Sequence, residues 1–156
     1  MGFLKCCFYL FAMGCSSFLI GTLLPRRWFS PEQKLFVCHA FERGGTIYTK
    51  LRIHTWKHRL PDMSKILPKI IPSKNLLAHS RDDLPKVIQE TCKAEFVHWV
   101  LYFTGFYCIR LWPGFGGVIV SVLSFLGNLM YVIIQRYNRP RFCQIWDRHV
   151  QHSQQR

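Results

Sequence analysis

Two long apolar runs constrain the fold of this 156-residue sequence more than any other feature. Residues 3–24 carry a single charge, Lys5, and residues 116–134 carry none. At about 1.5 Å per residue, each run approaches or exceeds the length needed to cross a hydrocarbon layer of roughly 30 Å. Because lipid offers the backbone no hydrogen-bond partners, such segments are helical. The sequence therefore predicts an all-α membrane protein.

A third apolar segment, residues 96–112, precedes the second long run. It is short for a full span and ends in Arg110 and Trp112, which suit a membrane interface. The pairs Pro113-Gly114 and Gly116-Gly117 follow, and both are typical of tight turns. We therefore expect residues 96–112 and 116–134 to form a transmembrane hairpin, which gives about three transmembrane helices in one membrane domain over residues 1–156.

The basic residues predict how this domain lies in the membrane. Nineteen of the 21 Lys and Arg residues fall within residues 25–95 or 135–156. Short basic loops stay in the cytoplasm, so we predict a multi-pass cell-membrane protein with its N-terminus outside and residues 135–156 as a cytoplasmic tail. The net charge of +13 suits a surface beside anionic membrane lipids. Without an RNA-binding or recognition-helix pattern, no nucleic-acid partner is expected.

Residues 25–94 form the predicted cytoplasmic or interfacial segment, and they are expected to contain amphipathic helix. Residues 28–43 begin with the helix-start signal Ser30-Pro31-Glu32, and a second helix is expected over 48–59, stopped by Pro61. Residues 63–80 read as a loop, after which a helix restarts near 80–83 and continues towards the apolar segment at 96. Whether residues 3–24 are cleaved as a signal peptide stays open.

Glu95 and His98 are the first candidates for chemistry because their i, i+3 spacing places them on one helical face near the lipid. Ionisable residues there are costly and usually functional. E-x-x-H is half of a di-iron site, but no second copy exists, so neither metal nor cofactor is expected. His98 can be the base that deprotonates an alcohol, with Glu95 fixing its tautomer. An interfacial His capped by Glu95, without catalysis, is the alternative.

Several further polar groups fall at predicted helix ends. The pairs His58/Asp62 and His79/Asp83 do not match the H-x-x-x-x-D motif of soluble-domain lipid acyltransferases. Asn128, alone among apolar residues, is expected to hydrogen-bond another helix. Residues 56–58, 95–98 and 136–141 all lie at cytoplasmic helix ends. We expect them to share one interfacial cleft, which suits an enzyme that joins an acyl donor to an amphiphilic acceptor.

Three motifs carry a resemblance to a known family. "WKHRLPD", "ETCKAEFVHW" and "GNLMYVIIQRYNRPR", in this order and at these separations, resemble the bacterial glycosyl-4,4'-diaponeurosporenoate acyltransferases, which are small membrane enzymes of carotenoid pigment synthesis. The resemblance implies esterification of a sugar hydroxyl of a glycosylated carotenoid or similar glycolipid with a fatty acyl chain from acyl-CoA or an acyl carrier protein. One departure concerns helix shape, since Leu129 follows Asn128 where the family usually has Pro.

The same resemblance implies site residues. Glu95 and His98 are the expected catalytic pair. The expected substrate-binding residues are Trp56, Lys57, Asp62, Trp99, Arg136, Tyr137, Asn138, Arg139 and Arg141. The arginines would neutralise a phosphate-bearing acyl donor or a lipid headgroup, and Pro140 would end the helix. The alternative is a non-catalytic membrane adaptor whose basic face binds anionic lipid or a partner enzyme.

Overall fold

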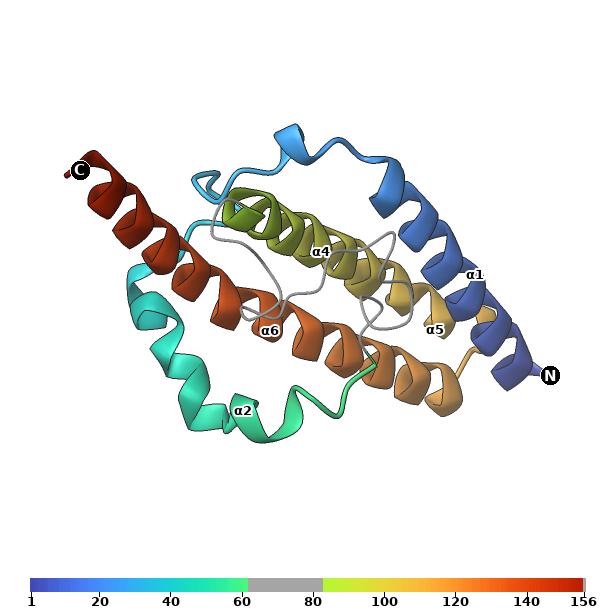
Figure 1. Cartoon of the computed structure of the whole chain (residues 1–156). Coiled ribbons are helices and arrows are strands. Elements are labelled where there is room, and N and C mark those ends of the chain that lie inside the picture. The colour runs from blue at the N-terminus through green and yellow to red at the C-terminus, as the bar shows by residue number, and fades with distance from the viewer. Residues whose placement is uncertain (62–82, 156) are drawn as a thin grey trace. The chain divides into compact units, whose positions relative to one another are not determined.

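The structure, a computed structural model, describes residues 1–61 and 83–155. These ranges contain helices and no strands, which confirms the predicted all-α class. The elements are α1 (Gly2–Leu23), η1 (Arg26–Trp28), η2 (Ala40–Leu51), α2 (Ile53–Trp56), α4 (Leu84–Thr104), η5 (Gly105–Tyr107), α5 (Cys108–Leu111) and α6 (Phe115–Gln154) (Figure 1).

The chain divides into two compact units. The first unit consists of residues 1–24 and 93–133, and the second unit consists of residues 25–92 and 134–156. The long helices α4 and α6 each contribute residues to both units.

In the first unit, α1 packs along α5 and the end of α4. The Sγ of Cys6 contacts the carbonyl oxygen of Cys108 at 3.7 Å, and the Tyr9 hydroxyl donates to the carbonyl oxygen of Thr104 at 3.0 Å. Between α5 and α6 the chain turns at Gly114, whose φ of 103° is strained for any residue with a side chain. The turn predicted at Pro113-Gly114 is therefore confirmed, whereas the Gly116-Gly117 pair, also predicted as turn, lies inside α6.

Two of the described helices, α1 and α6, are long and apolar enough to cross a membrane. Many of their large apolar side chains are exposed, such as Phe8 and Phe11 on α1 and Leu123 on α6. The expectation that residues 80–94 continue into the apolar segment is confirmed from Leu84 onwards, because α4 runs unbroken to Thr104. The predicted third span over 96–112 stays a prediction.

The core of the second unit lies between α4 and the C-terminal part of α6. Leu84, Val87 and Ile88 share one face of α4 by their i, i+3 and i+4 spacing, and they pack against Phe142 of α6. Partly buried Cys143, Ile145 and Trp146 complete this cluster. A 2.5 Å ion pair between Arg26 and Glu90 adds a polar contact to α4.

Two helices predicted for the second unit are wrong. Residues 28–43 contain only the last residue of η1, then turns, and the start of η2, so they are not one helix. The predicted helix over 48–59 is split between η2 and α2 at Arg52, where φ is +48°. The physical reason for the first error is that the carbonyls of Leu35 and Phe36 accept hydrogen bonds from arginine side chains, whereas in a helix they would bond to backbone N–H groups.

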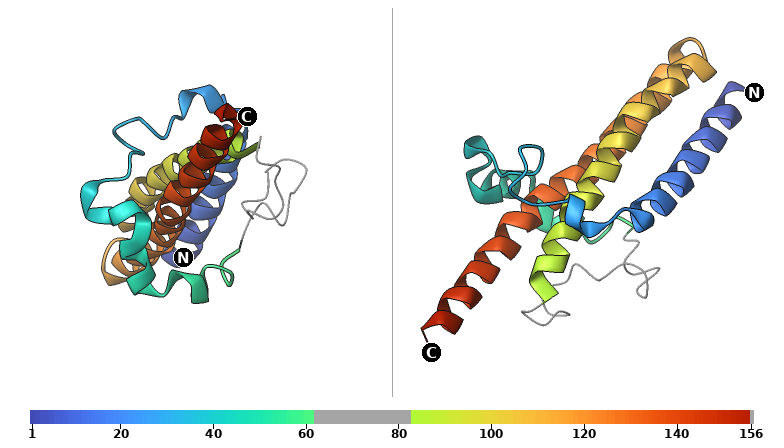
Figure 2. Two further views of the ribbon diagram at one scale, coloured as in Figure 1. Left: turned by 60° about the vertical axis from the view of Figure 1, so that its left-hand side comes forward. Right: turned by 90° about the horizontal axis from the view of Figure 1, so that it is seen from above.

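The predicted helix end at Pro140 is also wrong, because α6 continues without interruption to Gln154 (Figure 2). A proline inside a helix deprives the carbonyl four residues earlier, that of Arg136, of its donor and displaces the next one, that of Tyr137. Arg141 donates to the Tyr137 carbonyl at 2.5 Å. Gly45 packs so closely that a Cβ there would lie 3.2 Å and 3.3 Å from these two carbonyl oxygens. The Arg141 side chain thus supplies a hydrogen bond to one of these carbonyls, that of Tyr137, and Gly45 packs against both.

Candidate functional site

The polar residues of the second unit gather around the part of α6 that contains the motif QRYNRPR. Tyr137, which is buried, has two cations at its ring. The guanidinium carbon of Arg141 lies 3.5 Å from the ring centroid, and the Nζ of Lys57 lies 5.2 Å from it. Two of the predicted motifs therefore meet at this ring, which we call the Tyr137 cation site (Lys57, Tyr137 and Arg141).

The Tyr137 cation site is electrostatically unbalanced. Burial lowers the pKa of the Lys57 ammonium, and the positive charge of Arg141 lowers it further. Within residues 1–61 and 83–155, neither Lys57 nor Arg141 has a carboxylate partner. Both cations lie at the ring of Tyr137, and aromatic rings attract cations.

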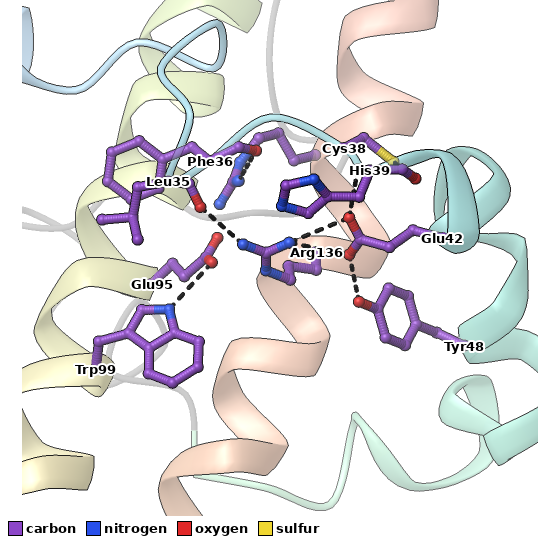
Figure 3. A network of polar contacts seen from close by, with 10 residues as sticks. Leu35, Phe36, Cys38, His39, Glu42, Tyr48, Glu95, Trp99 and Arg136 are labelled. Carbon is purple, nitrogen blue, oxygen red and sulfur yellow. Dashed lines mark hydrogen bonds and ion pairs between the residues drawn. The ribbon is translucent and has the colours of Figure 1, made fainter.

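Arg136 is paired inside the protein. Its Nη1 donates to both carboxylate oxygens of Glu42 at 3.1 Å, and its Nη2 donates to the carbonyl oxygen of Leu35 at 2.7 Å (Figure 3). The buried Glu42 also accepts from the backbone N–H of His39 at 2.7 Å and from the hydroxyl of Tyr48. Burial alone would raise the Glu42 carboxyl pKa, but these hydrogen bonds and the Arg136 charge outweigh it and lower the pKa below its ordinary value.

Arg139 is buried, with 4% of its surface exposed, and binds to the protein through its whole guanidinium. Its Nε donates to the hydroxyl of Thr91 at 3.0 Å, its Nη2 to the carbonyl of Thr91 at 3.3 Å, and its Nη1 to the carbonyl of Phe36 at 2.6 Å. The guanidinium carbon also lies 5.4 Å from the centroid of the Phe36 ring. These contacts favour a structural role for Arg139.

A pocket of about 240 Å³ lies beside these arginines in the second unit. It is lined by Pro31, Phe36, Cys38, Glu42, Arg136, Arg139, Pro140, Cys143 and Gln144. Burial raises the pKa of the Cys143 thiol, and the negative charge of Asp147 raises it further. Cys143 is therefore a protonated thiol at neutral pH and a poor nucleophile.

In the first unit, His98 is oriented by an amide. Its Nδ1 lies 3.1 Å from the Oδ1 of Asn128, and the Nδ2 of Asn128 donates to the carbonyl of Ser124 at 2.9 Å. Because Nδ2 is bound in this way, Oδ1 faces the imidazole and accepts a hydrogen bond from Nδ1–H. The basic nitrogen of neutral His98 is then Nε2. The ring of His98 also stacks on that of Tyr131, with centroids 4.6 Å apart.

The interhelical hydrogen bond predicted for Asn128 is thus confirmed, and its partner is the predicted catalytic His98. Glu95, one turn earlier on α4, is fully buried and accepts from the indole Nε1 of Trp99 at 3.2 Å (Figure 3). From the sequence, Glu95 was expected to fix the tautomer of His98, whereas in the structure the Oδ1 of Asn128 lies at its Nδ1.

The remaining predicted site residues are Trp56, Asn138 and Asp62. The Nε1 of Trp56 donates to the carbonyl of Leu51 at 2.8 Å, and Asn138 is half-buried on α6. Asp62, like His79 and the predicted loop over 63–80, lies outside the described residues. The expectation of one cleft shared by all three motifs stays a prediction. No cluster of three or more His, Cys, Asp or Glu side chains able to hold a metal occurs in the part of the chain that the structure describes.

Sequence reasoning missed several residues of these clusters. Glu42 and Tyr48 were not singled out, although Glu42 is one of only eight acidic residues in a strongly basic chain. Thr91 lies inside the quoted motif ETCKAEFVHW, but its hydroxyl carries no sequence signal of an arginine partner. Tyr131 is one aromatic residue among many in an apolar helix, so its stacking on His98 was not predictable.

Comparisons with known proteins complete this description. Residues 25–148 match the family described as glycosyl-4,4'-diaponeurosporenoate acyltransferase. A relative with that name from Staphylococcus aureus strain MRSA252 is 29% identical over 127 residues, which cover 81% of this chain and 76% of the relative. Relatives with the same name from strains USA300 and Newman are 28% identical with the same coverage. No solved structure matches the chain.

Proposed function

The chain belongs to the glycosyl-4,4'-diaponeurosporenoate acyltransferase family and is an acyltransferase, and we propose that it esterifies a sugar hydroxyl of a glycosylated carotenoid, or of a similar glycolipid, with a fatty acyl chain. The observation that carries the proposal is that the family match spans all three motifs, and with them Lys57, His98 and Arg141. An adaptor without chemistry would not need a histidine oriented by a second helix.

We place this reaction at a cell membrane. The two apolar helices α1 and α6 support the membrane location, and the distribution of basic residues supports an N-terminus outside and an active site at the cytoplasmic face. The proposal keeps residues 96–112 as a further span, which makes the protein multi-pass.

The proposed chemistry is base-assisted transfer from a thioester donor. The sugar hydroxyl oxygen attacks the acyl carbonyl carbon, and His98 Nε2 takes the hydroxyl proton as the new C–O bond forms. The tetrahedral intermediate then collapses, the C–S bond breaks, and the imidazolium returns the proton to the departing sulfur. General base catalysis of this kind contributes about 10²- to 10⁴-fold in rate.

Two neighbours support His98 in this mechanism. Asn128 accepts a hydrogen bond from Nδ1–H and so favours the tautomer of neutral His98 whose lone pair is on Nε2. We assign the buried carboxyl group of Glu95, on the same face of α4, to electrostatic stabilisation of the imidazolium that forms. Asn128 acts through His98 and is therefore a positioning residue.

The test is acyl transfer by the full chain in membranes, supplied with a glycosylated carotenoid and either acyl-CoA or acyl carrier protein thioester. We expect a new ester by mass spectrometry. A His98→Gln variant should lose about 10²- to 10⁴-fold in turnover, while His54→Gln, which changes an exposed histidine of the second unit, should keep wild-type activity. Absence of ester with wild-type protein, or wild-type turnover by His98→Gln, would contradict the proposal.

A further inference from the structure

The arginines of the motif QRYNRPR divide into two kinds. Arg136 donates to Glu42 and to a backbone carbonyl, and Arg139 donates to Thr91 and Phe36. Arg141 differs, because its Nη1 donates to the Tyr137 carbonyl at 2.5 Å and its other N–H groups have no acceptor among the described residues. Arg141 is thus the arginine of this motif with donors available for a ligand.

Lys57 brings a second cation to the same place. Its ammonium group, half-buried at the ring of Tyr137, has three donors and no acceptor within residues 1–61 and 83–155. Removing two like charges from water beside each other is costly unless an opposite charge compensates them. The lowered pKa of Lys57 is a symptom of that cost. An anion bound between Lys57 and Arg141 would remove it.

We propose that the Tyr137 cation site binds a phosphate group, and that this phosphate belongs to the acyl donor. This inference rests on the proposed function. A phosphate offers several negatively charged oxygens to two cations at once, and the planar guanidinium of Arg141 matches its geometry. Thioester donors carry phosphate next to the pantetheine arm that bears the acyl group. The buried ring of Tyr137 holds both cations in position for it.

The same phosphate chemistry has a second source, the headgroup of a membrane phospholipid, and binding measurements separate the two. The full chain is purified in an alkyl maltoside, which contains no phosphate. Calorimetry then measures binding of coenzyme A and of pantetheine, which lacks phosphate. In parallel, mass spectrometry measures how much phosphatidylglycerol the protein retains through washing.

We expect coenzyme A to bind and pantetheine to bind at least 10-fold more weakly. Lys57→Gln and Arg141→Gln should each raise the Kd for coenzyme A by roughly 10- to 100-fold, which is the range for loss of a charge-assisted contact. Arg148→Gln removes the same charge from an exposed position of the same helix and should change the Kd less than 2-fold. Phosphatidylglycerol retention should not depend on the two cations.

Two results would overturn the inference. Unchanged coenzyme A binding by folded Lys57→Gln and Arg141→Gln proteins would show that these cations only pack against Tyr137. Dependence of phosphatidylglycerol retention, but not of coenzyme A binding, on the two residues would assign the phosphate to a lipid and overturn the donor assignment. Circular dichroism verifies folding. If both variants unfold, Arg141→Lys serves instead, since it keeps the charge and loses the planar fork, and its Kd should still rise several-fold.

Different results would contradict the phosphate site and the proposed function. If coenzyme A binding depends on Lys57 and Arg141 but no ester forms, the proposed function fails and the phosphate site stands. If the wild-type protein forms the ester and neither substitution changes the KM for the thioester, the phosphate site fails and the function stands.

Discussion

The polar clusters of the two units differ in the charge of the groups that make their hydrogen bonds. Around His98 the orienting contact is a hydrogen bond to an uncharged group, the amide of Asn128. Around Arg136 and Arg139 the contacts involve full charges, and buried carboxylate and carbonyl oxygens balance them. A neutral, oriented histidine suits proton transfer, whereas paired arginines suit the assembly of the irregular segment 29–48. By contrast, neither Lys57 nor Arg141, which meet at the Tyr137 ring, has a carboxylate partner within residues 1–61 and 83–155.

The largest effect that this comparison predicts is on stability, at Glu42. Glu42→Gln leaves the largely buried Arg136 guanidinium without its counter-charge, so we expect a loss of about 3–5 kcal/mol in the free energy of unfolding. Thermal or denaturant unfolding in detergent measures it. Glu32→Gln, an exposed carboxylate of the same unit, is the control and should change stability by less than about 0.5 kcal/mol. Equal effects of the two would refute the structural role of the pair.

In the first unit the corresponding change should affect catalysis more than stability. Asn128→Leu removes the acceptor of His98 Nδ1–H, so we expect kcat to fall about 10- to 100-fold with little change in KM. Asn128→Asp restores an acceptor with a negative charge. It should therefore recover part of the activity that Asn128→Leu loses. Wild-type kcat in the Asn128→Leu enzyme would show that Asn128 only packs the helices.

A smaller stability effect should appear where Gly45 meets α6. Gly44→Ala and Gly45→Ala both put a side chain at positive φ, at +64° and +82°. Only the methyl group at 45 would also press on the carbonyls of Arg136 and Tyr137. We expect Gly45→Ala to cost about 1–3 kcal/mol more than Gly44→Ala, measured by thermal unfolding. Equal losses of stability in the two variants would mean that the carbonyls of Arg136 and Tyr137 can move away from the new methyl group at no cost in free energy.

The smallest effect is a pH dependence that comes from Glu42. Its pKa is lower in the folded protein than in the unfolded chain, so between these two values the unfolded chain binds more protons. This contribution to stability is fully present above the ordinary carboxyl pKa of about 4.3 and is lost as pH falls through the folded value. Melting temperatures from pH 7 to pH 3 should therefore fall more steeply for wild type than for Glu42→Gln. Parallel curves would argue against this linkage.

The sequence allowed prediction of those features that are encoded locally. The lengths of the apolar runs predicted α1 and the first half of α6, the Pro113-Gly114 pair predicted the turn, and E-x-x-H spacing placed Glu95 and His98 on one helix. The errors have non-local causes. The positive φ of Arg52 has no residue signature, and Leu35 and Phe36 leave the helical state because arginines about 100 residues later bind their carbonyls.

Pro140 and Asn128 illustrate the same limit within α6. The helix α6 continues through Pro140, where Gly45 packs against the carbonyls of Arg136 and Tyr137, and no local rule predicts that contact. Asn128 was expected to bond another helix, but its partner 30 residues away became visible only in the structure. Local rules thus proposed residues for the candidate site, but they did not predict how those residues pair.

We propose that His98 supplies the base and that Lys57 and Arg141 bind the donor, and a single kinetic comparison tests this division of roles most directly. Initial rates of ester formation are measured against thioester concentration for wild type, His98→Gln and Arg141→Gln. We expect His98→Gln to lower kcat by about 10²- to 10⁴-fold at nearly unchanged KM. Arg141→Gln should raise the KM for the thioester by roughly 10-fold or more with a smaller change in kcat. The same kcat-to-KM pattern in both variants would contradict this division of roles.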